Sequence, residues 1–172
     1  VRTFNPYSGE PLTVVLAKDR QDYYFPAANA ELSFNDYQPG DKKVPFKVLS
    51  EVEGSKLVGI RYHQLFPWVK PEGDAFRVIA GDFVTTEDGT GVVHIAPTFG
   101  ADDDRVAKAS GIAPLILRDK YRNPEPMVDR RGRFYPIEDL DPDFVKSNVN
   151  VDLYREFAGR FVKNEYDSSL PE

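Results

Sequence analysis

The chain has 172 residues, of which 41% are hydrophobic and 13% aromatic, enough apolar material for the core of one compact domain. It contains no cysteine, so nothing indicates a disulfide or thiolate-metal framework. No apolar run approaches the roughly 20 residues of a membrane span, and the start does not resemble a secretory leader. A cytoplasmic setting is therefore expected. The net charge of −6 excludes general electrostatic attraction to nucleic acid, so any RNA contact must be local.

Five short β-like runs follow one another along the first hundred residues. Pro, Gly, Asn and Asp residues, which favour turns, separate them. The runs are residues 12–17, 46–52, 57–62, 75–84 and 92–96. The short connections at Gly54 and Gly89 predict hairpins, and the 14 prolines mark further connections because helix interiors and central strands exclude proline.

Two helices are expected after these runs. The first covers about residues 102–110: three consecutive aspartates from Asp102 suit the positive end of the helix dipole, and Gly111 is placed to end the helix in a left-handed conformation. A second helix or helical turn is expected at about residues 151–157, after the turn at Pro142. These elements predict a mainly β structure with peripheral helices (α+β), built on a curved or barrel-like antiparallel sheet and forming a single domain over residues 1–172.

Most of the functional signal lies between Gly81 and Gly111. A Gly-Thr-Gly turn at residues 89–91 lets the backbone approach a ligand closely, and the apolar run after it delivers His94 near its end. The Ala-Pro-Thr-Phe-Gly loop at residues 96–100 then leads directly into the acidic first turn of the expected helix. One histidine and one or more carboxylates therefore border a strand-loop-helix corner.

Several chemistries could use this corner. A metal site is disfavoured because consecutive aspartates on a helix point about 100° apart. A nucleophilic triad would need a cysteine or a Gly-x-Ser-x-Gly elbow, and a phosphate-binding loop would need the lysine and spacing of a P-loop. The remaining option is a cation site, in which an aspartate holds an ammonium group while His94 and the loop shape a small pocket. The aspartates could equally serve only to cap the helix, and His94 could be an ordinary strand-end residue.

The stretch Gly-Thr-Gly-Val-Val-His-Ile-Ala-Pro-Thr-Phe-Gly-Ala-Asp-Asp at residues 89–103 resembles the signature of the editing domain inserted in isoleucyl-tRNA synthetases. The leucine and valine relatives share the Gly-Thr-Gly start and the later acid but generally carry Met or Lys at the position of His94. Supporting similarity covers most of the chain, at residues 3–7, 14–19, 62, 65–67, 76–79 and 157–162. The resemblance implies the curved antiparallel fold of a class I synthetase editing domain.

The resemblance implies post-transfer editing, in which valine misattached to the isoleucine tRNA is hydrolysed from the 3′ end. One methylene is worth only about 1–3 kcal/mol in a binding pocket, and the isoleucine enzyme is itself the established example of this limit. By position, Asp103 would pair with the α-ammonium group of the amino acid, and His94 would line the pocket and exclude isoleucine. Gly89, Thr90 and Gly91 would shape the pocket floor or hold the turn.

The resemblance also implies what the nucleophile is and which parts of the parent synthetase this chain lacks. Water, positioned by a ribose hydroxyl of the substrate and by backbone groups, is the expected nucleophile, so no catalytic residue is assigned. The family's threonine-rich segment does not occur in this chain, and residues 168–172 close no element. The domain is therefore expected to be truncated at both ends. Alone, it is expected to be weakly active or inactive as a hydrolase. The signatures for ATP and Mg in the parent synthetase are missing too, so no cofactor and no metal is expected in this domain.

The expected partners are the 3′ acceptor end of the isoleucine tRNA, the misattached valine and the remainder of the synthetase chain, without a membrane. The only locally basic segment, residues 118–133, carries three candidate tRNA contacts, which a solvated loop would also explain: Arg130, Arg131 and Arg133. His63 is expected at the surface. The alternative to an editing hydrolase is a non-catalytic domain that binds the tRNA acceptor end or packs against the synthetase body.

Overall fold

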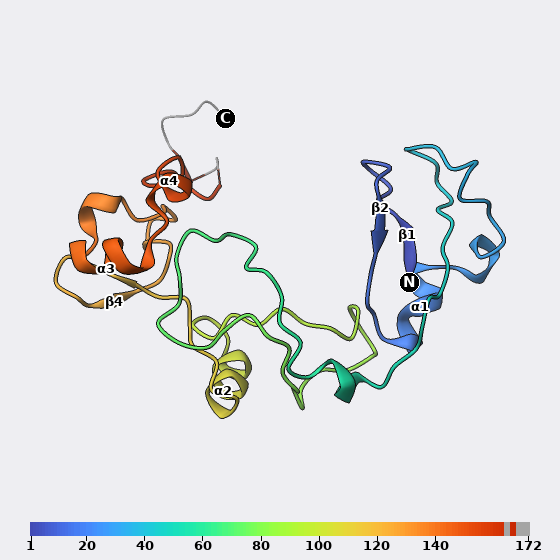
Figure 1. The fold of residues 1–172 in the computed structure, drawn as a ribbon, viewed down its shortest axis with the longest axis horizontal. Coiled ribbons are helices and arrows are strands. Elements are labelled where there is room, and N and C mark those ends of the chain that lie inside the picture. The colour runs from blue at the N-terminus through green and yellow to red at the C-terminus, as the bar shows by residue number, and fades with distance from the viewer. Residues whose placement is uncertain (164–165, 168–172) are drawn as a thin grey trace. The chain divides into compact units, whose positions relative to one another are not determined.

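The computed structural model describes residues 1–163 and 166–167, so the expectation for residues 168–172 lies outside the described residues. The chain divides into two compact units. Figure 1 colours the ribbon from the N-terminus to the C-terminus, so the stretches of each unit can be followed by residue number. Unit 1 comprises Val1–Val58 and Ile79–His94, and unit 2 comprises Gly59–Val78 and Ile95–Glu172. Each unit is therefore assembled from two separate stretches of sequence, and each has its own packing.

Unit 1 is built on a short antiparallel hairpin. Strand β1 (Arg2–Phe4) pairs with strand β2 (Pro11–Thr13), with Thr3 opposite Leu12. The helical elements of this unit are single turns: η1 (Lys18–Arg20), α1 (Gln21–Tyr24), η2 (Ala27–Asn29) and η3 (Gly54–Leu57). Most of unit 1 is therefore loop, arranged around one hairpin.

Aromatic rings and one buried hydroxyl bind the loops of unit 1 to β1. The Phe4 ring stacks on Tyr37 with centroids 4.7 Å apart, and Thr3 Oγ1 donates a hydrogen bond to Pro45 O at 2.9 Å. Phe46, the next residue along, is buried. This small core fixes the segment around residue 45 against the hairpin.

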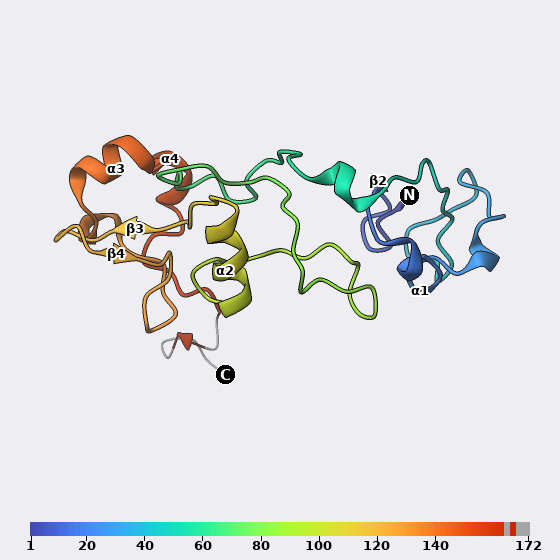
Figure 2. The same ribbon diagram turned by 90° about the horizontal axis from the view of Figure 1, so that it is seen from below.

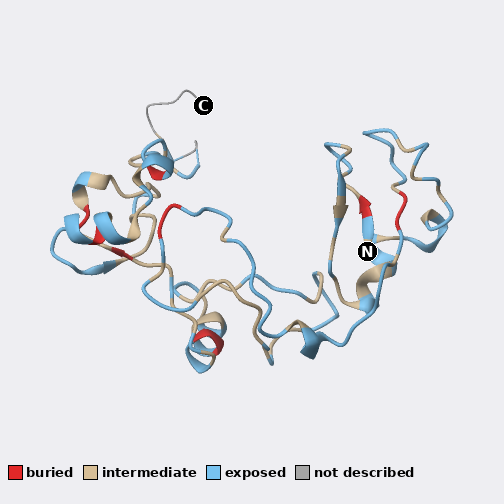
Figure 3. Ribbon diagram, viewed as in Figure 1, coloured by how far each residue is buried: buried red, intermediate tan, exposed pale blue. Residues whose placement is uncertain are grey.

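Unit 2 contains the larger group of buried side chains. It gathers Trp68, Val69, Leu117, Leu140, Phe144 and Tyr154. Figure 3 colours the buried parts of the chain red. The Trp68 ring stacks on Phe157 at 4.4 Å, and the Tyr154 hydroxyl donates to Tyr135 O at 2.7 Å. Burial raises the pKa of the Tyr154 hydroxyl above its usual value of 10.0. Since burying one large apolar side chain contributes about 1.5–3 kcal/mol, this cluster dominates the stability of the unit.

The regular elements of unit 2 contribute several residues of this cluster, and Figure 2 draws α3 next to β3 and β4. They are α2 (Ala101–Ala109), β3 (Leu117–Arg118), β4 (Pro124–Glu125), η4 (Ile137–Asp139), α3 (Pro142–Asn148) and α4 (Val151–Tyr154). Strands β3 and β4 are antiparallel. Helix α3 begins with a proline after Asp141, whose side chain accepts a hydrogen bond from Phe144 N at 2.8 Å, the expected arrangement of a helix N-cap.

Both predicted helices are confirmed. Helix α2 matches the predicted residues 102–110 within one residue at each end, and Gly111 has a left-handed φ of 66° where the helix was expected to end. Helix α4 covers the first part of the predicted residues 151–157. Within the described residues, no helix has the length and apolar character that crossing a bilayer requires.

The predicted strands are mostly wrong. Strand β2 overlaps the first run, but the other four runs contain no strand, and the turn expected at Gly54 is helix η3. Residues 57–62 and 75–84 do meet, through an isolated antiparallel bridge between Arg61 and Arg77 and a few backbone hydrogen bonds around it, but they form no strand. The described residues form two two-stranded antiparallel sheets and no closed barrel, and helical residues outnumber strand residues. The architecture is therefore α+β with small sheets, because β-like runs become strands only where a partner runs alongside for several residues.

Candidate functional site

Asp103 lies in the first turn of α2, and its carboxylate folds back over the loop that precedes the helix. The half-buried side chain accepts a hydrogen bond at Oδ2 from the Ala96 backbone N–H, at 2.9 Å. This approach requires glycine at position 100, because a Cβ on Gly100 would lie 2.8 Å from the same oxygen. The loop and the carboxylate therefore fix each other's positions.

The two neighbouring aspartates are engaged by basic residues of the same helix. Asp102 Oδ1 lies 3.4 Å from Arg105 Nη2, and Asp104 Oδ2 lies 2.6 Å from Lys108 Nζ. Helix geometry explains both pairs, since side chains three or four residues apart are neighbours on a helix surface. The charges of these two carboxylates are thus satisfied within α2.

Asp103 differs because the positions three and four residues later are apolar. They are Val106 and Ala107, which are buried and anchor α2 in unit 2. Among the described residues no basic side chain forms an ion pair with Asp103, and its second oxygen, Oδ1, accepts no hydrogen bond. Asp103 is thus the aspartate of this turn that has no basic partner among the described residues.

The Gly-Thr-Gly turn is held in unit 1 by the segment that follows β2. Arg20 Nε donates to Gly89 O at 2.9 Å, and Ala17 N donates to Thr90 O at 2.7 Å. Gly91 has a left-handed φ of 73°, and a Cβ there would lie 2.5 Å from the Ala17 Cβ. Both the conformation and the close approach require glycine at this position.

The side chain of Thr90 is used within the turn itself. Its hydroxyl donates to Val92 O at 2.9 Å and lies 3.3 Å from Val92 N, which donates to it. The contacts of Gly89, Thr90 and Gly91 in this structure are thus those of a structural turn. Their contribution to a pocket floor stays a prediction.

His94 is the last residue of unit 1, whereas Asp103 belongs to unit 2. The His94 side chain is exposed and makes no hydrogen bond or ion pair with the described residues. The structure thus places each residue within its own unit, and the role of His94 in limiting side-chain size stays a prediction. Within residues 1–163 and 166–167, no group of three His, Asp or Glu side chains could hold a metal ion.

No family model matches the chain, but individual proteins do. The isoleucine--tRNA ligase of Bacteroides fragilis is 59% identical over 172 residues, which cover 100% of this chain and 15% of that protein. The ligase of Porphyromonas gingivalis is 57% identical over 173 residues, again 100% of the chain and 15% of the relative. The ligase of Thermoplasma volcanium is 36% identical over 154 residues, 87% of the chain and 13% of the relative.

The chain is a relative of one segment of the isoleucine--tRNA ligases. It spans about 15% of the length of the curated relatives that it matches along its entire length. The family resemblance predicted from residues 89–103 is thereby confirmed.

The basic stretch of this ligase segment, residues 118–133, contains two kinds of arginine. Three are paired with acidic side chains: Arg118, Arg122 and Arg133. Arg130 and Arg131 are exposed and form no ion pair with the described residues. Of the three arginines predicted to contact tRNA, two therefore have a free guanidinium group, while the third, Arg133, has its Nε 3.3 Å from Asp129 Oδ2.

Two residues that position the Gly-Thr-Gly turn of the ligase segment were missed at the sequence level. Ala17 and Arg20 contact the turn although Arg20 lies 69 positions before Gly89. The Arg20 guanidinium also lies over the Tyr23 ring, 4.6 Å from its centroid. No local pattern links segments so far apart, so only the fold identifies these residues.

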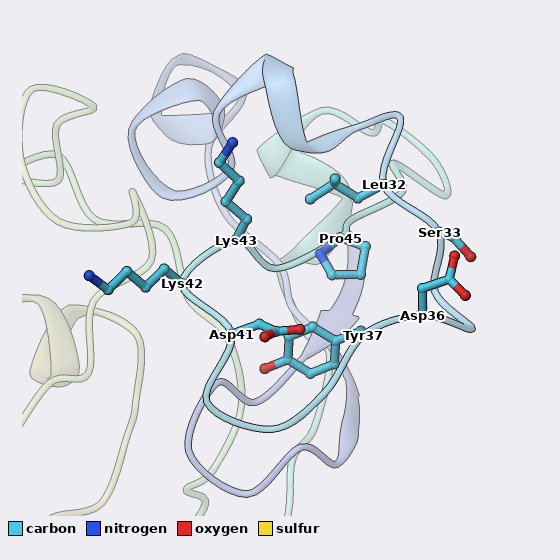
Figure 4. A pocket seen from close by; sticks show the side chains of 8 residues that line it. All are labelled: Leu32, Ser33, Asp36, Tyr37, Asp41, Lys42, Lys43 and Pro45. Carbon is cyan, nitrogen blue, oxygen red and sulfur yellow. The ribbon is translucent and has the colours of Figure 1, made fainter.

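The ligase segment also has a hollow of about 490 Å³ in unit 1, shown in Figure 4. Its lining is Leu32, Ser33, Asp36, Tyr37, Asp41, Lys42, Lys43 and Pro45. The Tyr37 hydroxyl is buried without a hydrogen-bond partner in the described part of the chain. The amino groups of Lys42 and Lys43 point in different directions (Figure 4). Because binding sites need polar groups that converge, this hollow identifies no class of ligand.

Proposed function

We propose that this segment forms the amino-acid-binding part of an editing site in an isoleucine--tRNA ligase, where valine wrongly attached to the isoleucine tRNA is hydrolysed. The observation that carries the proposal is the state of Asp103: one carboxylate oxygen is held by the Ala96 N–H, and no basic side chain among the described residues pairs with it. A charged ammonium group is a strong partner for such a carboxylate. The relationship to the ligases and the motif at residues 89–103 support the choice of substrate.

In this proposal Asp103 binds the α-ammonium group of the esterified valine, and His94 limits the size of the side chain. Water adds to the ester carbonyl carbon, and the bond between that carbon and the ribose oxygen breaks. The products are free valine and a tRNA with a free 3′-terminal hydroxyl group. The chain contributes binding and orientation, and ATP and Mg belong to the remainder of the ligase.

The test uses the full-length ligase and preformed Val-tRNA. The Asp103→Asn variant keeps an oxygen that accepts the Ala96 N–H but loses the charge, so it should fold normally. A charge-assisted hydrogen bond contributes about 1.5–3 kcal/mol, so the single-turnover rate of valine release should fall about 10- to 100-fold. Circular dichroism and thermal unfolding of the variant should match the wild type.

The neighbouring aspartates supply matched controls. Asp102→Asn and Asp104→Asn each remove one negative charge from the same turn, but those charges belong to exposed ion pairs, so valine release should change by less than about threefold. Equal losses in all three variants would attribute the effect to the charge of the helix end. Unchanged valine release by Asp103→Asn would overturn the proposal and favour a non-catalytic domain that binds the acceptor end.

A further inference from the structure

A tight turn in unit 2 presents two arginines at its tip. The turn comprises residues 129–132 and lies between Val128 and Phe134, which form an antiparallel bridge. Arg130 and Arg131 occupy its two central positions. In Figure 2 the loop that follows β4 projects on the opposite side of β3 and β4 from α3.

The carboxylate of Asp129 organises this turn from within. Its Oδ1 accepts hydrogen bonds from Arg131 N at 2.8 Å and Arg133 N at 3.0 Å, and its Oδ2 accepts one from Arg133 Nε at 3.3 Å. Burial alone would raise the pKa of Asp129, but these hydrogen bonds and the charge of Arg133 outweigh burial and lower it. The carboxylate is therefore ionised at neutral pH, and three hydrogen bonds hold it within the turn.

The segment near residue 160 anchors the turn from outside. Phe134 N donates to Arg160 O at 2.9 Å, and Val162 N donates to Gly132 O at 2.9 Å. Gly132 has a left-handed φ of 79°, which closes the turn, and its N–H donates to Asp129 O at 3.0 Å. The backbone under the two arginines is thus fixed on both sides.

Among the described residues the two tip arginines have no acidic partner, although the chain as a whole is acidic. Its 28 acidic residues outnumber its 22 lysines and arginines, yet Arg130 and Arg131 form no ion pair with the described residues. The other arginines of the stretch, such as Arg118 and Arg122, are paired with acids. A guanidinium group offers a planar set of donors that matches a phosphate, and a fixed backbone lowers the entropy lost on binding.

We propose that the 129–132 turn is a phosphate-binding tip that contacts the phosphodiester backbone of the tRNA. Arg130 and Arg131 make the contacts, and Asp129 and Arg133 are positioning residues. The choice of RNA as the partner rests on the proposed function, but the surface is separate from Asp103. Local contact of this kind reconciles RNA binding with a net charge of −6.

The test measures the affinity of full-length ligase for uncharged tRNA across roughly 50 to 300 mM KCl. Each phosphate contact contributes about 0.7–0.9 to the slope of log affinity against log salt. The double variant Arg130→Ala, Arg131→Ala should therefore reduce the slope by about 1–2 and weaken binding at low salt about tenfold. The matched control, Lys42→Ala with Lys43→Ala, removes the same charge from exposed, unpaired positions of unit 1 and should leave the slope unchanged.

Asp129→Ala distinguishes two explanations of tRNA binding: arginines held in position by Asp129, or general attraction by positive charge. It makes the protein less negative, so general electrostatics predicts tighter tRNA binding, whereas a loosened tip predicts weaker binding, by about threefold or more. Circular dichroism and thermal unfolding of the variant check that the protein remains folded. Tighter or unchanged binding by a folded Asp129→Ala variant would overturn the positioning role.

Two results would overturn the phosphate-binding tip: an unchanged salt slope for the arginine pair, or equal changes for the arginine and lysine pairs. The first would point to an acidic protein surface as the partner, and the second to net charge alone. The outcome is distinguishable from failure of the editing site. Asp103→Asn is scored by valine release and the arginine pair by binding of uncharged tRNA, so either result can fail alone.

Discussion

The two units hold their candidate residues by different means. In unit 2, Asp103 is carried by a helix whose Val106 and Ala107 are buried, so its position depends on packing. In unit 1, the Gly-Thr-Gly turn is held by hydrogen bonds from Ala17 and Arg20, with few buried side chains nearby. Packing of apolar side chains is sensitive to their volume, whereas hydrogen bonds between loops are sensitive to backbone conformation and donor geometry.

This difference defines what each unit should tolerate. Unit 2 should lose most stability when a core side chain is truncated. Unit 1 should lose the order of its turn when a glycine gains a side chain or a donor is shortened. The largest effect should therefore come from the core of unit 2 and the smallest from a single donor in unit 1.

Truncation of Leu117 should have the largest effect. This residue of β3 is fully buried in the core of unit 2, so Leu117→Ala should lower the free energy of unfolding of that unit by about 2–5 kcal/mol. Urea denaturation followed by tryptophan fluorescence measures this unit, because the single tryptophan, Trp68, belongs to the same cluster.

Leu65 provides the matched control for this truncation. It also belongs to unit 2, but its side chain is 83% exposed, so Leu65→Ala should change the free energy of unfolding by no more than about 0.5 kcal/mol. Similar losses in the two variants would mean that the buried cluster does not dominate the stability of unit 2.

The helices of this packed unit could be predicted from sequence, but most strands could not. Helix α2 has its determinants within ten residues, from the acidic first turn to Gly111, and both ends were predicted closely. The run at residues 92–96 has a β-like composition, but Val92 and Val93 are about half exposed and belong to no strand. Strand formation depends on a distant partner, and composition carries no information about that partner.

The spacing of charged residues in the sequence indicates that Asp103, unlike its two neighbours, has no basic partner on its own helix. A helix beginning near residue 101 places Arg105 three residues after Asp102 and Lys108 four residues after Asp104. Asp103 has only apolar residues at those offsets. The sequence could thus identify which aspartate stays unpaired, whereas the bond from Ala96 N required the fold of the loop.

Gly91→Ala should produce the next largest effect, in unit 1. The left-handed φ of 73° costs about 1–2 kcal/mol for a residue with a Cβ, and contact with Ala17 at 2.5 Å adds to that cost. The bond from Ala17 N to Thr90 O should open more often, so hydrogen exchange at the Ala17 amide should accelerate about 10- to 100-fold.

Gly89→Ala tests the cost of the left-handed conformation without the steric contact with Ala17. Gly89 also has a left-handed φ, of 59°, but nothing lies within 4 Å of its missing Cβ. The variant should therefore show only the conformational cost, with a smaller acceleration at Ala17. If both variants accelerate exchange equally, close approach to Ala17 is not what requires glycine at position 91.

Arg20→Lys should have the smallest effect and is the sharpest probe of how unit 1 holds its turn. The guanidinium donates through Nε to Gly89 O and through Nη1 to Glu87 O at 3.0 Å, and a lysine ammonium keeps the charge but cannot reproduce two donors in a fixed plane. The loss of one exposed hydrogen bond should cost about 0.5–1 kcal/mol, seen as a twofold to fivefold faster exchange at Ala17. Tryptophan fluorescence, which follows unit 2, should not change. If Arg20→Lys leaves exchange at Ala17 unaltered while Arg20→Ala accelerates it, the charge or packing of the side chain, rather than its paired donors, holds the turn.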